Sequence, residues 1–213
     1  MDTLNNKRPE RIIWITTDHM RFDFIGAYGN EVVHTPNLNF LANNGVNFMN
    51  CFCQNGLCMP SRASFMTGIY PQQTGITNNG HNLPDNFEPV APRLLKSAGY
   101  STAHIGKLHL QSHENHDLDP GGRNTYGFDT FWLSEARGCY EDSWMTWLRS
   151  TYPEHVNKFR VPRAPDRTGE EKRGTVLEAP WEASQSAWIV HMAQNYLGNK
   201  LVLIFMMRFF MCP

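Results

Sequence analysis

The sequence predicts an α/β fold built around a mostly parallel sheet. Short runs rich in β-branched and aromatic residues alternate along the chain with segments that carry helix signals. Alternation of this kind is typical of a parallel sheet covered by helices. Polar residues follow directly after several predicted strands, which is where sites gather in such sheets. The 213 residues suffice for one sizeable hydrophobic core, so we expect a single domain.

The predicted strands are apolar runs. The first covers residues 11–17, reads Arg-Ile-Ile-Trp-Ile-Thr-Thr and is followed by Asp18. Their near-continuous apolar character is typical of strands buried on both faces. The other predicted strands cover residues 46–52, 101–105 and 201–211. The last of these runs is interrupted by Arg208 and is too short to cross a membrane, so a buried strand explains it better.

The predicted helices are recognised by the residues at their ends. Thr35 and Pro36 form an N-cap followed by a proline at the first helical position, and Gly45 would end that helix. Further helices are expected over residues 61–67, 89–98 and 182–197. Between residues 139 and 178 the periodicity fades while charges and prolines accumulate, which indicates an irregular surface segment.

Composition and charge argue against nucleic-acid binding and against export. The net charge is −1, which argues against a broad polyanion-binding surface and hence against nucleic-acid binding. Residues 1–10 are polar and lack the apolar segment of a secretory signal, so we expect a polar tail and a cytoplasmic location.

Three of the five cysteines crowd one short segment. A disulfide framework is a poor interpretation for a chain of this length without an export signal. A zinc site built from Cys51, Cys53 and Cys58 is also disfavoured, because their spacing lacks the paired C-x-x-C pattern. Cys51 and Cys53 are instead expected to be small residues on the buried strand 46–52.

Residues 58–68 carry the most specific pattern in the chain, Cys-Met-Pro-Ser-Arg-Ala-Ser-Phe-Met-Thr-Gly. This run resembles the signature of the sulfatase family, in which the cysteine is oxidised after synthesis to formylglycine. The resemblance implies that the hydrate of this aldehyde at Cys58 is the nucleophile in sulfate-ester hydrolysis. It also implies a formylglycine-generating enzyme as a partner. Judged from these residues alone, a capped turn that leads into a helix is the plainer alternative.

The resemblance extends over residues 11–129 and, more weakly, through 182–197. The matching elements are Thr-Pro-Asn-Leu at 35–38, Gly-Val-Asn-Phe at 45–48, Gly-Lys-Leu-His-Leu at 106–110 and Gly-Phe-Asp at 127–129. The resemblance implies the alkaline-phosphatase-like sandwich, of which residues 11–200 would be the N-terminal part. Residues 201–213 are expected to be an atypical apolar tail, produced by truncation or a shift of reading frame.

Carried over residue by residue, the resemblance implies catalytic roles for Cys58, Arg62, Lys107 and His109. It further implies that Asp18 and the modified Cys58 bind a divalent cation, usually Ca²⁺ in sulfatases. Lys107 and His109 lie two residues apart after a predicted strand, so side-chain alternation would direct both toward one sulfate.

The chain departs from the family pattern at His19, where sulfatases commonly carry a second aspartate. Calcium prefers about six to eight oxygen ligands, so His19 is expected to take an outer role or to favour a different metal. The later metal ligands of the family lie beyond residue 213. We therefore expect an incomplete sulfatase that, by itself, turns over no aryl sulfate. Two alternatives are a phosphonate or phosphate monoester hydrolase of the same superfamily and a catalytically inactive anion-binding fragment.

Overall fold

In the part of the chain that the structure describes, a parallel sheet of four strands lies at the centre. The computed structural model describes residues 9–112, 124–135, 141–159 and 178–198 in full, and residues 202–207 by their backbone. The strands follow the order β1 (Ile12–Thr16), β4 (Val202–Met207), β2 (Ser101–Gly106) and β3 (Thr130–Leu133). All three pairings are parallel, and Ile204 of β4 lies opposite both Ile13 and Ala103. The predicted α/β class with a parallel sheet is thereby confirmed.

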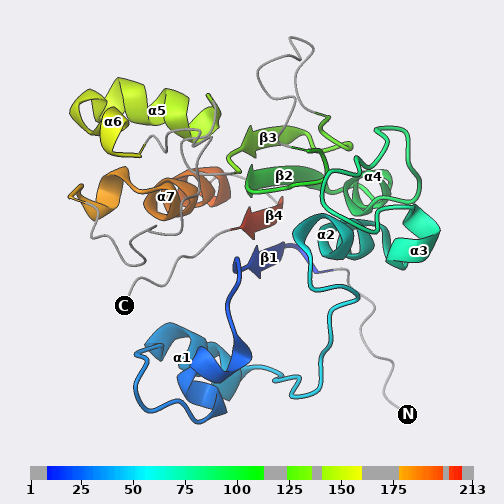
Figure 1. Ribbon diagram of the computed structural model, residues 1–213, viewed down its shortest axis with the longest axis horizontal. Coiled ribbons are helices and arrows are strands. Elements are labelled where there is room, and N and C mark those ends of the chain that lie inside the picture. Colours follow the sequence, from blue (N-terminus) through cyan, green and yellow to red (C-terminus); the bar gives the residue numbers. More distant parts are fainter. Residues whose placement is uncertain (1–8, 113–123, 136–140, 160–177, 199–201, 208–213) are drawn as a thin grey trace, which may run out of the picture.

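Helices pack on both sides of this sheet (Figure 1). One set comprises α5 (Ser143–Thr151), α6 (Val156–Phe159) and α7 (Gln185–Leu197). The opposite set comprises α2 (Cys58–Thr67), α3 (Pro71–Thr74) and α4 (Ala91–Ser97). The helix α1 (Pro36–Asn44) lies away from the sheet, next to the 3-10 turn Gly26–Tyr28. Within the described ranges, no helix is both long and apolar enough to cross a bilayer.

Strand β2 contributes to two hydrophobic cores because its side chains alternate between the faces of the sheet. Ala103 and Ile105 pack into the core formed with α5, α6 and α7. His104 points to the other face, where its ring lies 5.4 Å from the ring centroids of both Phe128 and Phe131. Complete burial lowers the pKa of His104 to about 3, so the imidazole is neutral in the sheet.

Most predicted elements are present, with shifted ends. The expectation that the first strand is buried is wrong, because Ile13, Trp14 and Ile15 of the edge strand β1 are 42–52% exposed. The helix predicted over 61–67 begins earlier, at Cys58, while the helices predicted over 89–98 and 182–197 are observed as α4 and α7. The apolar run 201–211 contains β4, paired on both sides. Thr35 precedes α1 as predicted, but its hydroxyl makes no cap bond to the helix and instead accepts the Gly26 N–H at 2.8 Å.

The strand predicted over residues 46–52 is absent, and this prediction is wrong. Phe48 and Phe52 are 73% and 81% exposed, and Cys51 and Cys53 are also exposed. The segment contains two asparagines, and the side chain of Asn47 accepts the hydroxyl of Tyr28 at 2.7 Å. The place beside β1 belongs to β4, whose apolar run has no such polar interruption.

The irregular segment predicted between residues 139 and 178 is also wrong in part. Residues 143–151 form α5, which begins where the Asp142 carboxylate accepts the Met145 N–H at 2.8 Å. Trp144, Met145 and Leu148 form its buried stripe. Residues 139–140 and 160–177 lie outside the described part of the chain. Strand β3 is not among the predicted strands, because its four residues are too few for a clear periodic signal.

The buried cap at Asp142 makes stability depend on pH. Burial raises the pKa of this carboxyl from 3.8 to about 6, so the folded state holds the proton more tightly than the unfolded state. The protonated carboxyl therefore favours the folded state. This contribution to the free energy of unfolding is about 3 kcal/mol, is complete below about pH 4 and is lost as the pH rises through about 6. Urea unfolding of the wild type and Asp142→Asn at pH 4 and 7.5 measures it. We expect the wild type to lose stability relative to the variant at the higher pH, and an unchanged difference would contradict this assignment.

Candidate active site

Asp18 lies just beyond the carboxyl end of β1, in a turn that buries its side chain. The Asp18 side chain is 7% exposed, whereas that of His19 is 81% exposed. His19 has a φ of 55°, in the left-handed region that residues other than glycine seldom adopt. The turn therefore directs two neighbouring side chains differently, the carboxylate inward and the imidazole toward solvent.

Cys58 is the first residue of α2, at the positive end of the helix dipole. Arg62 follows one helical turn later, so both side chains emerge on the same side of the helix. The Met59 N–H in the first turn donates to the side-chain oxygen of Asn79 at 3.0 Å, which fixes the helix start against a distant loop. Leu57, at the cap position, provides no capping side chain, so the tertiary contact from Asn79 takes that part.

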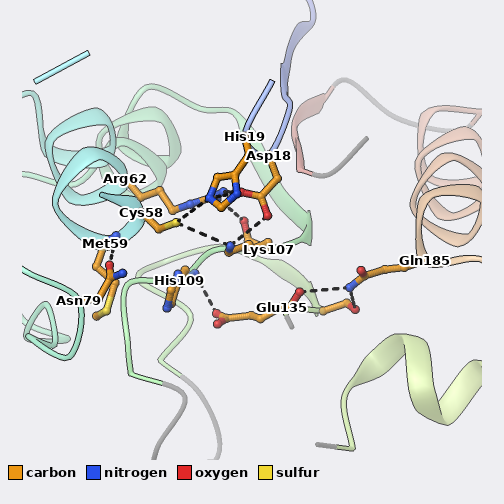
Figure 2. A network of polar contacts seen from close by, with 11 residues as sticks. Asp18, His19, Cys58, Met59, Arg62, Asn79, Lys107, His109, Glu135 and Gln185 are labelled. Carbon is orange, nitrogen blue, oxygen red and sulfur yellow. Dashed lines mark hydrogen bonds and ion pairs between the residues drawn. The ribbon is translucent and has the colours of Figure 1, made fainter. Parts of the chain in front are cut away.

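Lys107 follows β2 directly and connects the other groups. Its Nζ lies 3.1 Å from Asp18 Oδ2 and 4.0 Å from Cys58 Sγ (Figure 2). Arg62 donates to the Lys107 carbonyl at 3.0 Å and lies 3.6 Å from Asp18 Oδ1. The ends of β1 and β2 and the start of α2 thus converge, and they bring together four of the predicted site residues.

His109 lies in the same loop, but its side chain is not placed by the strand-like alternation that was predicted. The expected alternation of Lys107 and His109 requires an extended backbone, whereas His109 has a φ of 50°. Its backbone N–H donates to Glu135 Oε1 at 2.8 Å, and both residues are buried. The close-up shows His109 on the Glu135 side of Lys107 (Figure 2).

The sequence did not predict a role for the buried polar residues that connect to the His109 backbone. Glu135, which follows β3, is 2% exposed, and Gln185 at the start of α7 donates to its carbonyl at 3.4 Å. Gln185 also donates to the Ser134 hydroxyl, which donates in turn to Asp142 at 2.8 Å. For Ser134 and Glu135, the only signal would have been that they follow a strand, and that strand was not predicted.

The cluster of charged residues formed by Asp18, Arg62 and Lys107 favours an anion next to Cys58. Two cations, Lys107 and Arg62, face the single carboxylate of Asp18, so the cluster has an excess of positive charge. Arg62 also helps to lower the pKa of His104, although burial is the larger cause. A cavity of about 570 Å³ opens beside these groups, and Trp14, Asp18, His19, Cys51–Cys53, Cys58, Arg62 and Phe65 are among its lining residues.

Three possible metal ligands meet at the rim of this cavity. One donor atom each from Asp18, His19 and Cys58 lie within 4.8 Å of one another. His19 Nε2 lies 3.6 Å from Cys58 Sγ and 3.8 Å from Asp18 Oδ1. Calcium prefers oxygen ligands, so the Asp18 carboxylate suits it, whereas the Cys58 thiol and the His19 imidazole do not.

Comparison with known proteins agrees with the geometry. Residues 10–196 match the family model described as Sulfatase. An N-acetylglucosamine-6-O-sulfatase of Bacteroides thetaiotaomicron is 41% identical over 106 residues, which are 50% of this chain and 19% of that protein. An ulvan-active sulfatase of Formosa agariphila is 39% identical over 131 residues, 62% of this chain and 25% of that one. The chain thus spans about a quarter or less of the length of these relatives.

Solved structures show the same fold. A phosphonate monoester hydrolase of Agrobacterium radiobacter is similar with a TM-score of 0.68 at 24% identity, over 94% of this chain and 41% of that one. A structure in complex with D-glucosamine-2-N,6-O-disulfate is similar with a TM-score of 0.61 at 25% identity, over 95% and 34%. The predicted alkaline-phosphatase-like architecture is confirmed by these neighbours.

The buried ion pair between Lys107 and Asp18 is expected to matter for stability. Lys107→Met leaves the Asp18 carboxylate buried without its lysine partner, and we expect the free energy of unfolding to fall by about 3 kcal/mol. Urea unfolding measures the loss. Arg21→Met is the matched control, because the Arg21–Asp23 pair is 72% and 42% exposed and solvent screening leaves it little effect on stability. Equal losses in the two variants would contradict the special role of the buried pair.

Proposed function

Since the chain belongs to the sulfatase family, we propose that it serves the hydrolysis of sulfate monoesters through a formylglycine formed from Cys58. The observation that carries the proposal is the position of Cys58 at the start of α2, with Lys107 4.0 Å from its sulfur and Arg62 one turn away. A nucleophile at this place has positive charge and a helix dipole ready for a sulfuryl group.

In the proposed reaction, one hydroxyl oxygen of the formylglycine hydrate attacks sulfur, and the sulfur–oxygen bond to the alcohol breaks. The alcohol leaves with a proton, and the sulfate stays on the former Cys58 carbon. The second hydroxyl then loses its proton, the carbon–oxygen bond to sulfate breaks, and the aldehyde reforms. Water adds across the aldehyde and restores the hydrate. An unmodified cysteine or serine lacks this second hydroxyl and would keep a stable adduct.

The neighbouring residues take roles that fit their positions. Arg62 orients the hydrate from one helical turn away, and its contact with the Lys107 carbonyl holds the two cations together. Lys107 neutralises the sulfuryl oxygens, and His109 is proposed to protonate the leaving alcohol oxygen. The hydrogen bond from the His109 backbone to Glu135 keeps the loop in its left-handed conformation.

We further propose that Asp18 and the hydrate oxygen at position 58 bind Ca²⁺, with His19 in an outer role. Conversion of Cys58 replaces sulfur by oxygen, and the donors then suit a hard cation. The bound cation would supply charge neutralisation at the sulfate. Residues 11–200 would contribute one part of a sulfatase catalytic domain, whose curated relatives are several times longer than the aligned region. A formylglycine-generating enzyme is the partner that this proposal requires.

The alternative with specific support is a phosphonate monoester hydrolase, because proteins of that description share the fold. The deciding assay compares aryl sulfate with aryl phosphonate. It uses the formylglycine form of the 213 residues, alone and extended by the C-terminal part of the relative that is 41% identical. We expect the extended chain to hydrolyse the sulfate faster, and Cys58→Ala to abolish turnover. Faster phosphonate hydrolysis would favour the alternative, and sulfate binding without turnover would indicate an inactive anion-binding protein.

Cys58 alone is expected to be converted to formylglycine. The signature at 58–68 directs the modification, whereas the exposed Cys51 and Cys53 lack the Pro-Ser-Arg that follows Cys58. Peptide mapping by mass spectrometry after co-expression with a formylglycine-generating enzyme measures it. Modification of Cys51 or Cys53 in place of Cys58 would overturn the assignment of the nucleophile.

Asp18 is expected to contribute more to calcium binding than His19 once Cys58 is converted. The Asp18 carboxylate is a buried oxygen donor, while His19 offers an exposed nitrogen. Calorimetric titration of the formylglycine form should show a much larger loss of calcium affinity for Asp18→Asn than for His19→Gln. A larger loss in the histidine variant would mean that the bound cation prefers nitrogen.

A further inference from the structure

We propose that the chain binds Zn²⁺ before Cys58 is converted, through Asp18, His19 and the Cys58 thiolate. The three residues offer one oxygen, one nitrogen and one sulfur donor, all within 4.8 Å of one another. This site belongs to the thiol form of the protein and does not require that the proposed hydrolysis takes place.

Two of the three distances between the donors are close to those of a tetrahedral zinc ion. With Zn–S of about 2.3 Å and Zn–N of about 2.0 Å, tetrahedral angles place sulfur and nitrogen about 3.5 Å apart. The observed distance from Cys58 Sγ to His19 Nε2 is 3.6 Å. A nitrogen and a carboxylate oxygen on the same ion lie about 3.4 Å apart, and His19 Nε2 lies 3.8 Å from Asp18 Oδ1. The His19 side chain is 81% exposed, so solvent and not packing surrounds the imidazole that has to approach the carboxylate.

The chemistry of the donors selects the metal. Thiolate and imidazole are preferred by zinc, whereas calcium and magnesium prefer oxygen. His19 has no direct part in the proposed hydrolysis, yet its left-handed backbone holds the ring next to the nucleophile. Three protein ligands leave a fourth position for water, as in open zinc sites.

The neighbouring cations limit the affinity without blocking the site. Lys107 contacts Asp18 Oδ2 at 3.1 Å, while His19 faces the other oxygen, Oδ1. One carboxylate oxygen can therefore bind the ion while the second keeps its lysine. Arg62, 3.6 Å from Oδ1, adds repulsion. We expect weaker binding than at closed sites with four protein ligands.

Conversion of Cys58 would then change which metal the site prefers. The thiolate disappears and an oxygen takes its place, so the donor set becomes harder and zinc loses its strongest ligand. The state of residue 58 would thus decide between zinc and an oxygen-preferring cation.

The test uses the 213-residue chain produced without the modifying enzyme, with Zn²⁺ and, as a spectroscopic probe, Co²⁺. We expect one equivalent of Co²⁺ to give a thiolate-to-metal absorption band and tetrahedral visible bands, and Zn²⁺ to displace it. Cys58→Ser, His19→Gln and Asp18→Asn should each weaken binding at least about tenfold, since even indirect supporting partners are worth that much. Cys53→Ser and His81→Gln, at an exposed cysteine and an exposed histidine, are the matched controls and should bind as the wild type does.

A second measurement is independent of variant folding. Zn²⁺ should slow alkylation of Cys58 by iodoacetamide in the wild type but leave Cys51 and Cys53 reactive, as read by peptide mapping. The proposal is overturned if no thiolate band appears, if Zn²⁺ protects Cys51 or Cys53 and not Cys58, or if Cys53→Ser rather than His19→Gln abolishes binding. None of these results bears on turnover of a sulfate ester by the converted form, so the two proposals fail separately.

Discussion

The buried ion pair between Lys107 and Asp18 holds together the ends of two strands that are not neighbours in the sheet. Asp18 follows β1 and Lys107 follows β2, and β4 lies between these strands. Both side chains are 7% exposed, so the Lys107 ammonium is compensated by Asp18, and the Asp18 carboxylate by Lys107 and Arg62. The arrangement of α2 also depends on the pair, because Arg62 donates to the Lys107 carbonyl while it faces Asp18.

This arrangement leaves Cys58 at the edge of a positively charged cluster and not within the hydrophobic core. The thiol is held by the start of α2, whose first turn is tied to Asn79 from a separate loop. An anionic group beside residue 58 would therefore meet a helix dipole and two cations whose positions are already set. Preorganised charge of this kind is what a reaction at a sulfuryl group requires.

A second network of hydrogen bonds contacts the Lys107–His109 loop at His109. Glu135 accepts the His109 N–H, and Gln185 and Ser134 connect this region to the cap of α5 at Asp142. These groups come from β3, α5 and α7, so the helices on one side of the sheet support a loop that faces the helix α2 on the other. The ring of His104 is neutral, so this buried histidine adds no charge to the group formed by Asp18, Arg62 and Lys107.

The residue types that matter, and the elements that hold them, were determined by local sequence. Residues 58–68 specify a helix, because a proline in the first turn, helical spacing and a left-handed Gly68 at the end act within one short segment, although the start at Cys58 also relies on Asn79 from another loop. The apolar runs of β1, β2 and β4 likewise determined their own strands. The run at 46–52 did not form a strand, and two asparagines interrupt its apolar pattern, whereas the strand that pairs with β1 lies about 150 residues further along the chain, as the partner Ile204 of Ile13 shows.

Only the tertiary structure decided which of these residues meet. The 3.1 Å contact of Lys107 with Asp18 joins residues 89 positions apart, and it exists because the strand order brings their loops to one edge of the sheet. Glu135 could not be anticipated, since its role comes from a backbone N–H of His109 rather than from a motif. The meeting of His19 with Cys58 depends in the same way on a left-handed turn, which the sequence around His19 does not specify by itself. Local patterns select residues and elements, whereas distances between remote side chains follow from strand order and backbone conformation, which are properties of the whole fold.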